Sequence, residues 1–178
     1  MKRILVHDKT FELTIPFSEI DHAIDQIGIQ MDKDLIGKDV VMLCILNGAF
    51  MFAADLMKKL TLPCRVTFVK VTSYQGTNSV GAVKELIGLN EDLTGKTVVI
   101  LEDIVDTGRT IEQILETVKA KNPAEIKIAT MLFKPTACIR PVKLDYVGLE
   151  IPDDFMVGYG LDYDGFGRNL PDMYTLVK

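Results

Sequence analysis

Residues 97–110 read TVVILEDIVDTGRT, and they indicate more about the fold than any other part of the chain. The apolar run at 97–101 has the length and β-branched content of a buried parallel strand. Two carboxylates, Glu102 and Asp103, follow where we expect that strand to end. The small residues at 106–110 then lead into apolar side chains at helical spacing, which are Ile111, Ile114, Leu115 and Val118.

This order of elements predicts an anion site beside a carboxylate site. Backbone N–H groups at the start of a helix attract phosphate. The carboxylates can bind a divalent cation or ribose hydroxyl groups. Solvated loop acids followed by a simple turn are the alternative interpretation, although an ordinary turn rarely combines these features.

Strand and helix patterns alternate along most of the chain. Strands are expected at residues 40–46, 64–71, 97–101, 126–133 and 146–150. A first helix is expected to begin with Ser18 as its N-cap, and two more at 50–60 and 110–121. The alternation predicts an α/β fold, with a central parallel sheet flanked by helices. We expect residues 1–178 to form one domain, whose tail at 152–178 folds with the N-terminus as a small hood.

Polar residues follow several of the expected strands. In open parallel sheets, sites lie at the carboxyl ends of the strands. Those ends hold Asn47-Gly48, Ser73-Tyr74, the acid pair and Lys134, so one site is predicted. The polar, glycine-containing residues 73–81 are expected to form a mobile loop that closes over it, with a hairpin tip as the alternative.

Composition excludes several classes of protein. Of the 178 residues, 48% are apolar and 25% charged, which is typical of a globular chain. A net charge of −5 argues against a nucleic-acid partner. Charges interrupt the apolar stretches, so no membrane span or export signal is expected. The three cysteines have no metal-binding spacing and are expected to be core thiols of a cytoplasmic protein.

The segment at 97–110 resembles, along its whole length, the phosphoribosyl-pyrophosphate signature of the type I phosphoribosyltransferases. Residues 131–135 (MLFKP), 150–163 (EIPDDFMVGYGLDY) and 165–171 (GFGRNLP) resemble, in this order, the 6-oxopurine branch of that family. The resemblance covers about residue 40 to the C-terminus. It implies purine salvage, in which phosphoribosyl pyrophosphate and hypoxanthine or guanine give IMP or GMP and pyrophosphate. It also implies a homodimer or homotetramer.

The resemblance assigns the phosphoribosyl half of the site. Glu102 and Asp103 would hold the ribose hydroxyls and, together with Asp162, the cofactor Mg²⁺. Asp106, near the purine N7, is the candidate catalytic general base or acid. The loop that would bind the 5′-phosphate consists of Asp106, Thr107, Gly108, Arg109 and Thr110.

The resemblance also assigns the purine and pyrophosphate contacts. The ammonium of Lys134 can donate to the carbonyl oxygen of a 6-oxopurine and would repel the amino group of adenine. Phe155 would stack on the base, and the Met156 backbone and Asp162 would meet its edge. The pyrophosphate contacts would be Asn47, Gly48, Ser73, Tyr74 and Arg168. A surface lysine, a core phenylalanine and surface charges are the alternative interpretation.

One loop departs from the family pattern. The family has Leu-Lys-Gly or Leu-Arg-Gly, with a cis peptide before the glycine, where this chain has Leu46-Asn47-Gly48. Backbone contacts to pyrophosphate can survive this change. The basic side chain that helps to tie the loop across a subunit interface is missing.

Three other functions are weighed against a 6-oxopurine enzyme. Lys134 and Phe155 argue against an adenine- or orotate-directed relative. A non-catalytic phosphoribosyl-pyrophosphate sensor that binds nucleic acid would need a basic face, and this chain is acidic. A dinucleotide-dependent oxidoreductase would need a G-x-G-x-x-G turn, which is missing. Among the bases, hypoxanthine is expected to be preferred to guanine and guanine to xanthine.

Overall fold

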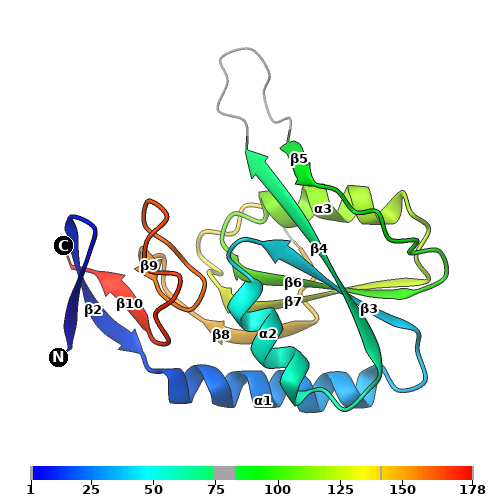
Figure 1. Ribbon diagram of the computed structural model, residues 1–178, viewed down its shortest axis with the longest axis horizontal. Coiled ribbons are helices and arrows are strands. Elements are labelled where there is room, and N and C mark those ends of the chain that lie inside the picture. Colours follow the sequence, from blue (N-terminus) through cyan, green and yellow to red (C-terminus); the bar gives the residue numbers. More distant parts are fainter. Residues whose placement is uncertain (1, 74–82, 141, 178) are drawn as a thin grey trace.

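The structure is a computed structural model that describes residues 2–73, 83–140 and 142–177. It contains two sheets that lie beside each other (Figure 1). The larger sheet has the strand order β5-β4-β3-β6-β7-β8. Its strands are β3 (Val40–Leu46), β4 (Cys64–Ser73), β5 (Val83–Ile87), β6 (Thr97–Val105), β7 (Glu125–Phe133) and β8 (Tyr146–Glu150).

Five strands of the larger sheet are parallel, and β5 is antiparallel to β4. Helices α1 (Phe17–Asp34) and α2 (Phe50–Lys59) cover one face, and α3 (Arg109–Lys119) covers the other (Figure 1). Successive side chains of a strand point to opposite faces. Met42 and Cys44 of β3 accordingly pack in the cluster with α1 and α2, while Leu43 packs in the cluster with α3. The predicted α/β fold is confirmed.

Among the element boundaries that differ from the prediction, two have a clear physical cause. β6 continues past residue 101 to Val105, because its pairing with β7 continues from Glu102↔Thr130 to Val105↔Phe133. The acid pair therefore lies inside a strand and not after one. Ser18 as N-cap was also wrong, since α1 begins at Phe17 and the Phe17 N–H donates to Asp172 Oδ1 at 2.9 Å.

The smaller sheet is antiparallel and joins both ends of the chain, and we call this sheet, together with the rest of residues 155–172, the hood. Its order is β1-β2-β10-β9, made of β1 (Arg3–Val6), β2 (Lys9–Ile15), β9 (Met156–Val157) and β10 (Met173–Leu176). Val6, Phe11, Val157 and Tyr174 form its apolar core. The predicted small C-terminal hood is therefore present, and two N-terminal strands complete it.

The hood is attached directly to the larger sheet. The Tyr159 hydroxyl donates to Asp55 Oδ2 of α2 at 2.6 Å. A Cβ built on Gly160 would overlap the carbonyl oxygen of Gly48, so these two backbone segments touch. The hood is thereby held against the loop that follows β3.

Cys44 is a buried core thiol as expected, but Cys64 and Cys138 are only half-buried. No helix in the described ranges is long and apolar enough to cross a membrane. The expected closing loop at 73–81 lies, apart from Ser73, outside the described residues.

Candidate active site

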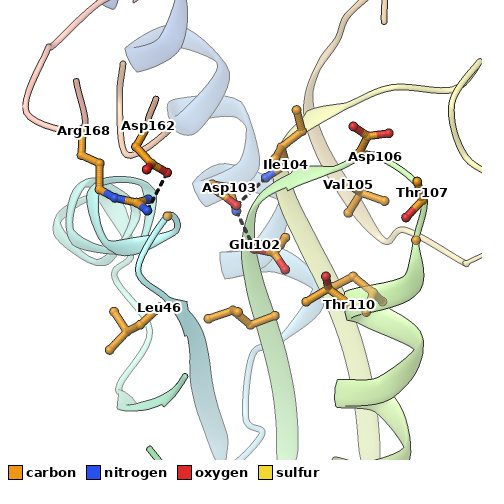
Figure 2. Close-up of a pocket in the computed structure, with 14 residues that line it drawn as sticks. Leu46, Glu102, Asp103, Ile104, Val105, Asp106, Thr107, Thr110, Asp162 and Arg168 are labelled. Atoms are coloured by element: carbon orange, nitrogen blue, oxygen red, sulfur yellow. Dashed lines mark hydrogen bonds and ion pairs between the residues drawn. The ribbon is translucent and has the colours of Figure 1, made fainter. Parts of the chain in front are cut away.

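A cavity of about 350 Å³ opens at the carboxyl ends of β3 and β6 (Figure 2). It lies where the larger sheet, the start of α3 and the hood meet. Its lining consists of Ile45, Leu46, Gly48, Glu102, Asp103, Ile104, Val105, Asp106, Thr107, Gly108, Thr110, Ile111, Asp162 and Arg168. Nine of the predicted site residues therefore line one cavity. Gly48 comes from the loop after β3, and the other eight come from β6, the loop that follows it, the start of α3 and the hood.

The acid pair of β6 forms the floor of this cavity. Glu102 is only 5% exposed, and its Oε1 accepts from the Asp103 N–H at 3.3 Å. Asp103 Oδ1 accepts from the Ile104 N–H at 2.9 Å. No Lys, Arg or His nitrogen of the described chain lies within 4.0 Å of either carboxylate. The floor is thus acidic and forms no ion pair within the described residues, although the charge of Arg168 across the cavity partly opposes the rise in the pKa of Asp103.

Burial raises the pKa of both floor carboxyls, because a low-dielectric surrounding disfavours the charged form. For Glu102 the neighbouring charge of Asp103 raises the pKa further. Cys44 lies behind the pair, and burial together with both acids raises its pKa to about 12. The thiol therefore stays protonated and behaves as a core side chain.

The loop after β3 lies directly against the floor. A Cβ built on Gly48 would overlap the Asp103 carboxylate, so only glycine fits there. The peptide between Leu46 and Asn47 is cis, so the cis bond lies one residue earlier than the Asn47–Gly48 bond expected from the family. Asn47 is exposed and its side chain is not part of the cavity lining.

The loop after β6 supplies backbone donors on the opposite side of the cavity. Gly108 occupies the N-cap position of α3 with φ +83° and makes no side-chain cap, and the Arg109 N–H donates only a long hydrogen bond, at 3.5 Å, to Thr107 Oγ1. The first N–H groups of a helix have no partner within it, so they remain available to an anion. A Cβ on Gly108 would come within 2.7 Å of the Arg140 carbonyl oxygen. Arg109 is exposed and lies outside the cavity lining.

Lys134 lies beside the cavity and contacts its wall through Asp106. The side chain is buried, with Nζ 3.0 Å from Asp153 Oδ1 and 3.4 Å from Asp106 Oδ2. Its backbone N–H donates to the Val105 carbonyl at 3.0 Å, which fixes the end of β7 against β6. The surface-lysine alternative is therefore wrong.

Phe155 and Met156 belong to the hood. Phe155 is 48% exposed, with its ring edge-on to Tyr163 at 6.0 Å, so it is not a core phenylalanine. Met156 is buried in β9. The structure thus presents an aromatic face to solvent on the hood.

Asp162 and Arg168 line the hood side of the cavity and bind each other (Figure 2). Arg168 Nη2 lies 2.6 Å from Asp162 Oδ1, and Arg168 Nη1 donates to the Gly160 carbonyl at 2.7 Å. Asp162 Oδ2 accepts from the Gly165 N–H at 2.7 Å. Asp162 thus shares the cavity with Glu102 and Asp103 but is paired with Arg168, and the described residues contain no group of three acidic, Cys or His side chains placed to hold a metal ion.

The site also contains residues that the sequence patterns did not single out. Ile104 and Val105 line the cavity because β6 is longer than expected. Asp153 contacts Lys134, and the only sequence signal for it was its place in the acidic segment 150–163. Ser73 ends β4, and Tyr74 lies outside the described residues.

The chain is similar in sequence and in fold to known proteins. Hypoxanthine phosphoribosyltransferase of Salmonella typhimurium is 40% identical over 172 residues, which cover 94% of this chain and 96% of that protein. A crystal structure of a hypoxanthine phosphoribosyltransferase from Staphylococcus aureus superposes with a TM-score of 0.88 at 38% identity, covering 93% and 91% of the two chains. The hypoxanthine phosphoribosyltransferase of Trypanosoma cruzi in complex with IMP has a TM-score of 0.87 at 34% identity, covering 93% and 94%.

The family assignment rests on most of the chain. Residues 17–164 match the family described as the phosphoribosyl transferase domain, a range that includes the floor, the loop after β6 and the first hood strand of the C-terminal segment. The chain therefore belongs to the phosphoribosyl transferase domain family.

Proposed function

We propose that this chain is a hypoxanthine phosphoribosyltransferase of purine salvage. It transfers the 5-phosphoribosyl group of phosphoribosyl pyrophosphate to N9 of hypoxanthine, and of guanine, and releases pyrophosphate. The observation that supports this most is one cavity with an acid pair that forms no ion pair within the described residues on one side and a helix N-terminus with a glycine N-cap on the other. The Trypanosoma cruzi relative, whose structure contains IMP, supports the same substrate class.

The two sides of the cavity suit the two ends of a ribose phosphate. The first turn of α3 and the hydroxyls of Thr107 and Thr110 would bind the 5′-phosphate, because backbone N–H groups and the helix dipole favour an anion. Gly108 allows the backbone to approach closely. Arg109 is proposed to act through its backbone N–H, since it starts α3 while its side chain lies outside the lining.

Glu102 and Asp103 would accept hydrogen bonds from the ribose 2′- and 3′-hydroxyls. We propose Mg²⁺ as the cofactor, because Mg²⁺ typically uses one or two protein carboxylates and completes its coordination with water and substrate oxygens. The floor pair fits that demand, with Asp162 as a further ligand once Arg168 has released it. When bound, Mg²⁺ neutralises charge on the leaving pyrophosphate.

The base would bind between Lys134 and the hood. Lys134 would donate to the 6-oxygen, Phe155 would stack on the purine, and Met156 and Asp162 would meet its edge. Asp106 contacts Lys134 and is therefore within reach of the imidazole side of that base, where it would exchange a proton as N9 attacks C1′. Pyrophosphate would leave toward Arg168, Gly48 and Asn47, with Ser73 and Tyr74 as further predicted contacts.

The remaining expectations are part of the same proposal. The chain is proposed to act as one domain in a homodimer or homotetramer. Its three free cysteines suit the reducing cytoplasm. The sensor without catalysis is the competing function, and none of the relatives compared above is described as one.

Steady-state assay of pyrophosphate release tests the proposal. We expect turnover with phosphoribosyl pyrophosphate and hypoxanthine, less with guanine, least with xanthine and none above background with adenine. A chain that binds phosphoribosyl pyrophosphate in a calorimeter but releases no pyrophosphate with any base would favour the sensor.

A further inference from the structure

The ammonium of Lys134 lies between two carboxylates that come from different parts of the fold. Asp106 belongs to the loop after β6 and Asp153 to the segment that leads into the hood. The contact with Asp153 is the shorter, at 3.0 Å against 3.4 Å. The lysine side chain is 8% exposed, while those of Asp106 and Asp153 are 44% and 60% exposed. Both acids thus meet solvent, and the cation between them does not.

This arrangement constrains where the ammonium can point. A lysine side chain has four rotatable bonds, so one carboxylate partner would draw Nζ fully toward itself. If Asp106 were that partner, the ammonium would form its best hydrogen bond with the group proposed to exchange the proton. Asp153 competes with Asp106 for the ammonium and has the shorter contact with it.

We propose that Asp153 is a positioning residue for Lys134. It holds the ammonium toward the place of the purine 6-oxygen and away from Asp106, so that Asp106 keeps an oxygen free for the base. The inference rests on the proposed function, because it concerns the purine end of that same site. Asp153 itself touches neither substrate nor reacting atoms in this scheme.

A purely structural role for Asp153 makes a different prediction. An exposed ion pair that only fastens the hood would change thermal unfolding, and it would affect both substrates alike. A positioning role changes the use of the base and leaves the phosphoribosyl donor untouched. The two roles therefore separate in the Michaelis constants of the two substrates.

The first experiment compares Asp153→Asn with Asp164→Asn and Asp153→Glu. Asparagine keeps an oxygen that can accept from Lys134 but removes the charge. Asp164 is the matched control, because it is also in the hood, is 73% exposed and has φ +51°, a conformation that asparagine tolerates. We expect Asp153→Asn to raise KM for hypoxanthine about tenfold, the size of one lost charged hydrogen bond, with KM for phosphoribosyl pyrophosphate unchanged. Asp153→Glu should recover most of the loss, and Asp164→Asn should match the wild type.

The second experiment tests whether Asp153 acts through Lys134. Calorimetry measures IMP binding to Asp153→Asn, Lys134→Gln and the double variant, so no turnover is needed. We expect Asp153→Asn to weaken IMP binding about tenfold alone and less than about twofold when Lys134 is already replaced. Equal effects in both backgrounds would overturn the proposal, and so would an unchanged or equally raised KM for both substrates. Wild-type turnover tests the proposed function separately, since it does not depend on either variant.

Discussion

The floor of the cavity and the ion pairs beside it differ in how their charges are balanced. Glu102 and Asp103 contact no Lys, Arg or His of the described chain, and burial raises the pKa of both. Lys134 has two carboxylate partners, and Arg168 is bound to Asp162 and to a backbone carbonyl. One part of the site therefore has an unmet demand for positive charge, and the other part is already paired.

This difference separates two ways of preparing a site. The floor is built into β6, so its carboxylates stay in place although burial makes them unfavourable as anions. Buried carboxylates without an ion-pair partner are typical of functional sites, where a bound ligand supplies a cation or hydroxyl donors to them. The Arg168–Asp162 pair beside the floor is partly exposed, so it can exchange partners at small cost when a substrate arrives.

Among the groups that are already in ion pairs, replacing Asp106, the candidate general acid or base, is expected to reduce activity most. Asp106→Asn keeps the size of the side chain but cannot exchange the proton, so kcat should fall by at least about tenfold and up to about ten-thousandfold. Stopped assays of IMP formation measure it, with Asp164→Asn as the control for an exposed carboxylate. A near-normal kcat would remove Asp106 from the mechanism.

The second largest effect is expected when the floor carboxylates are displaced without a change in their charge. In Gly48→Ala the new Cβ overlaps the Asp103 carboxylate, so the acid or the loop after β3 must move. We expect kcat/KM to fall about tenfold, because misplacing a substrate-holding group by about 1 Å has effects up to about a hundredfold. Gly95→Asn is the control, since a Cβ there meets nothing within 4 Å and its φ of +70° suits asparagine. Equal activities of the two variants would show that the floor tolerates displacement.

The unbalanced floor also predicts a pH dependence of stability. The raised pKa of Glu102 means that the folded state binds its proton more tightly than the unfolded chain, whose carboxyl titrates near about 4.3. Its contribution to the free energy of unfolding therefore falls as pH rises from that value through the raised pKa, and the penalty is complete above it. Glu102→Gln should raise Tm at neutral pH by about 3–6 °C while it lowers activity.

A balanced carboxylate should behave in the opposite way. The hydrogen bond from Lys38 lowers the pKa of Glu125, so this group stabilises the fold above its ordinary pKa and loses that effect as pH falls. Glu125→Gln should therefore lower Tm at neutral pH, and the difference from wild type should vanish in acid. Differential scanning calorimetry from acid to neutral pH measures the Tm of both variants. If both substitutions changed Tm in the same direction at neutral pH, the proposed difference between the floor and a paired carboxylate would be wrong.

The larger sheet could be predicted from the sequence because its strands are nearly continuous apolar runs. Six of the seven residues of β3 are buried, and its predicted bounds match the structure. The pattern failed where tertiary contacts override it. The start of α1 depends on Asp172, 155 residues away, and β6 continues past its apolar run because β7 still pairs with Glu102, Ile104 and Val105.

The site was predictable to the extent that it lies at the carboxyl edge of the sheet. Glu102, Asp103 and most of the loop after β6 line one cavity, as expected from their places near the carboxyl end of a strand, although both acids lie within β6. The partners of the charged groups were not predictable. The contacts of Asp153 with Lys134 and of Asp162 with Arg168 depend on where the hood lies, which no local pattern encodes.

The attachment of the hood to the larger sheet gives the smallest expected effect and tests whether the paired side depends on it. Tyr159→Phe removes the hydroxyl that donates to Asp55 at 2.6 Å, and Asp55 keeps its ion pair with Lys58. The loss of one hydrogen bond should cost about 1 kcal/mol and lower Tm by about 2–4 °C. If the hood carries only the paired groups, KM for hypoxanthine should rise slightly while the pH dependence assigned to Glu102 stays unchanged. A shift of that pH dependence in Tyr159→Phe would mean that the hood also sets the environment of the floor, and the two parts of the site would then not be independent.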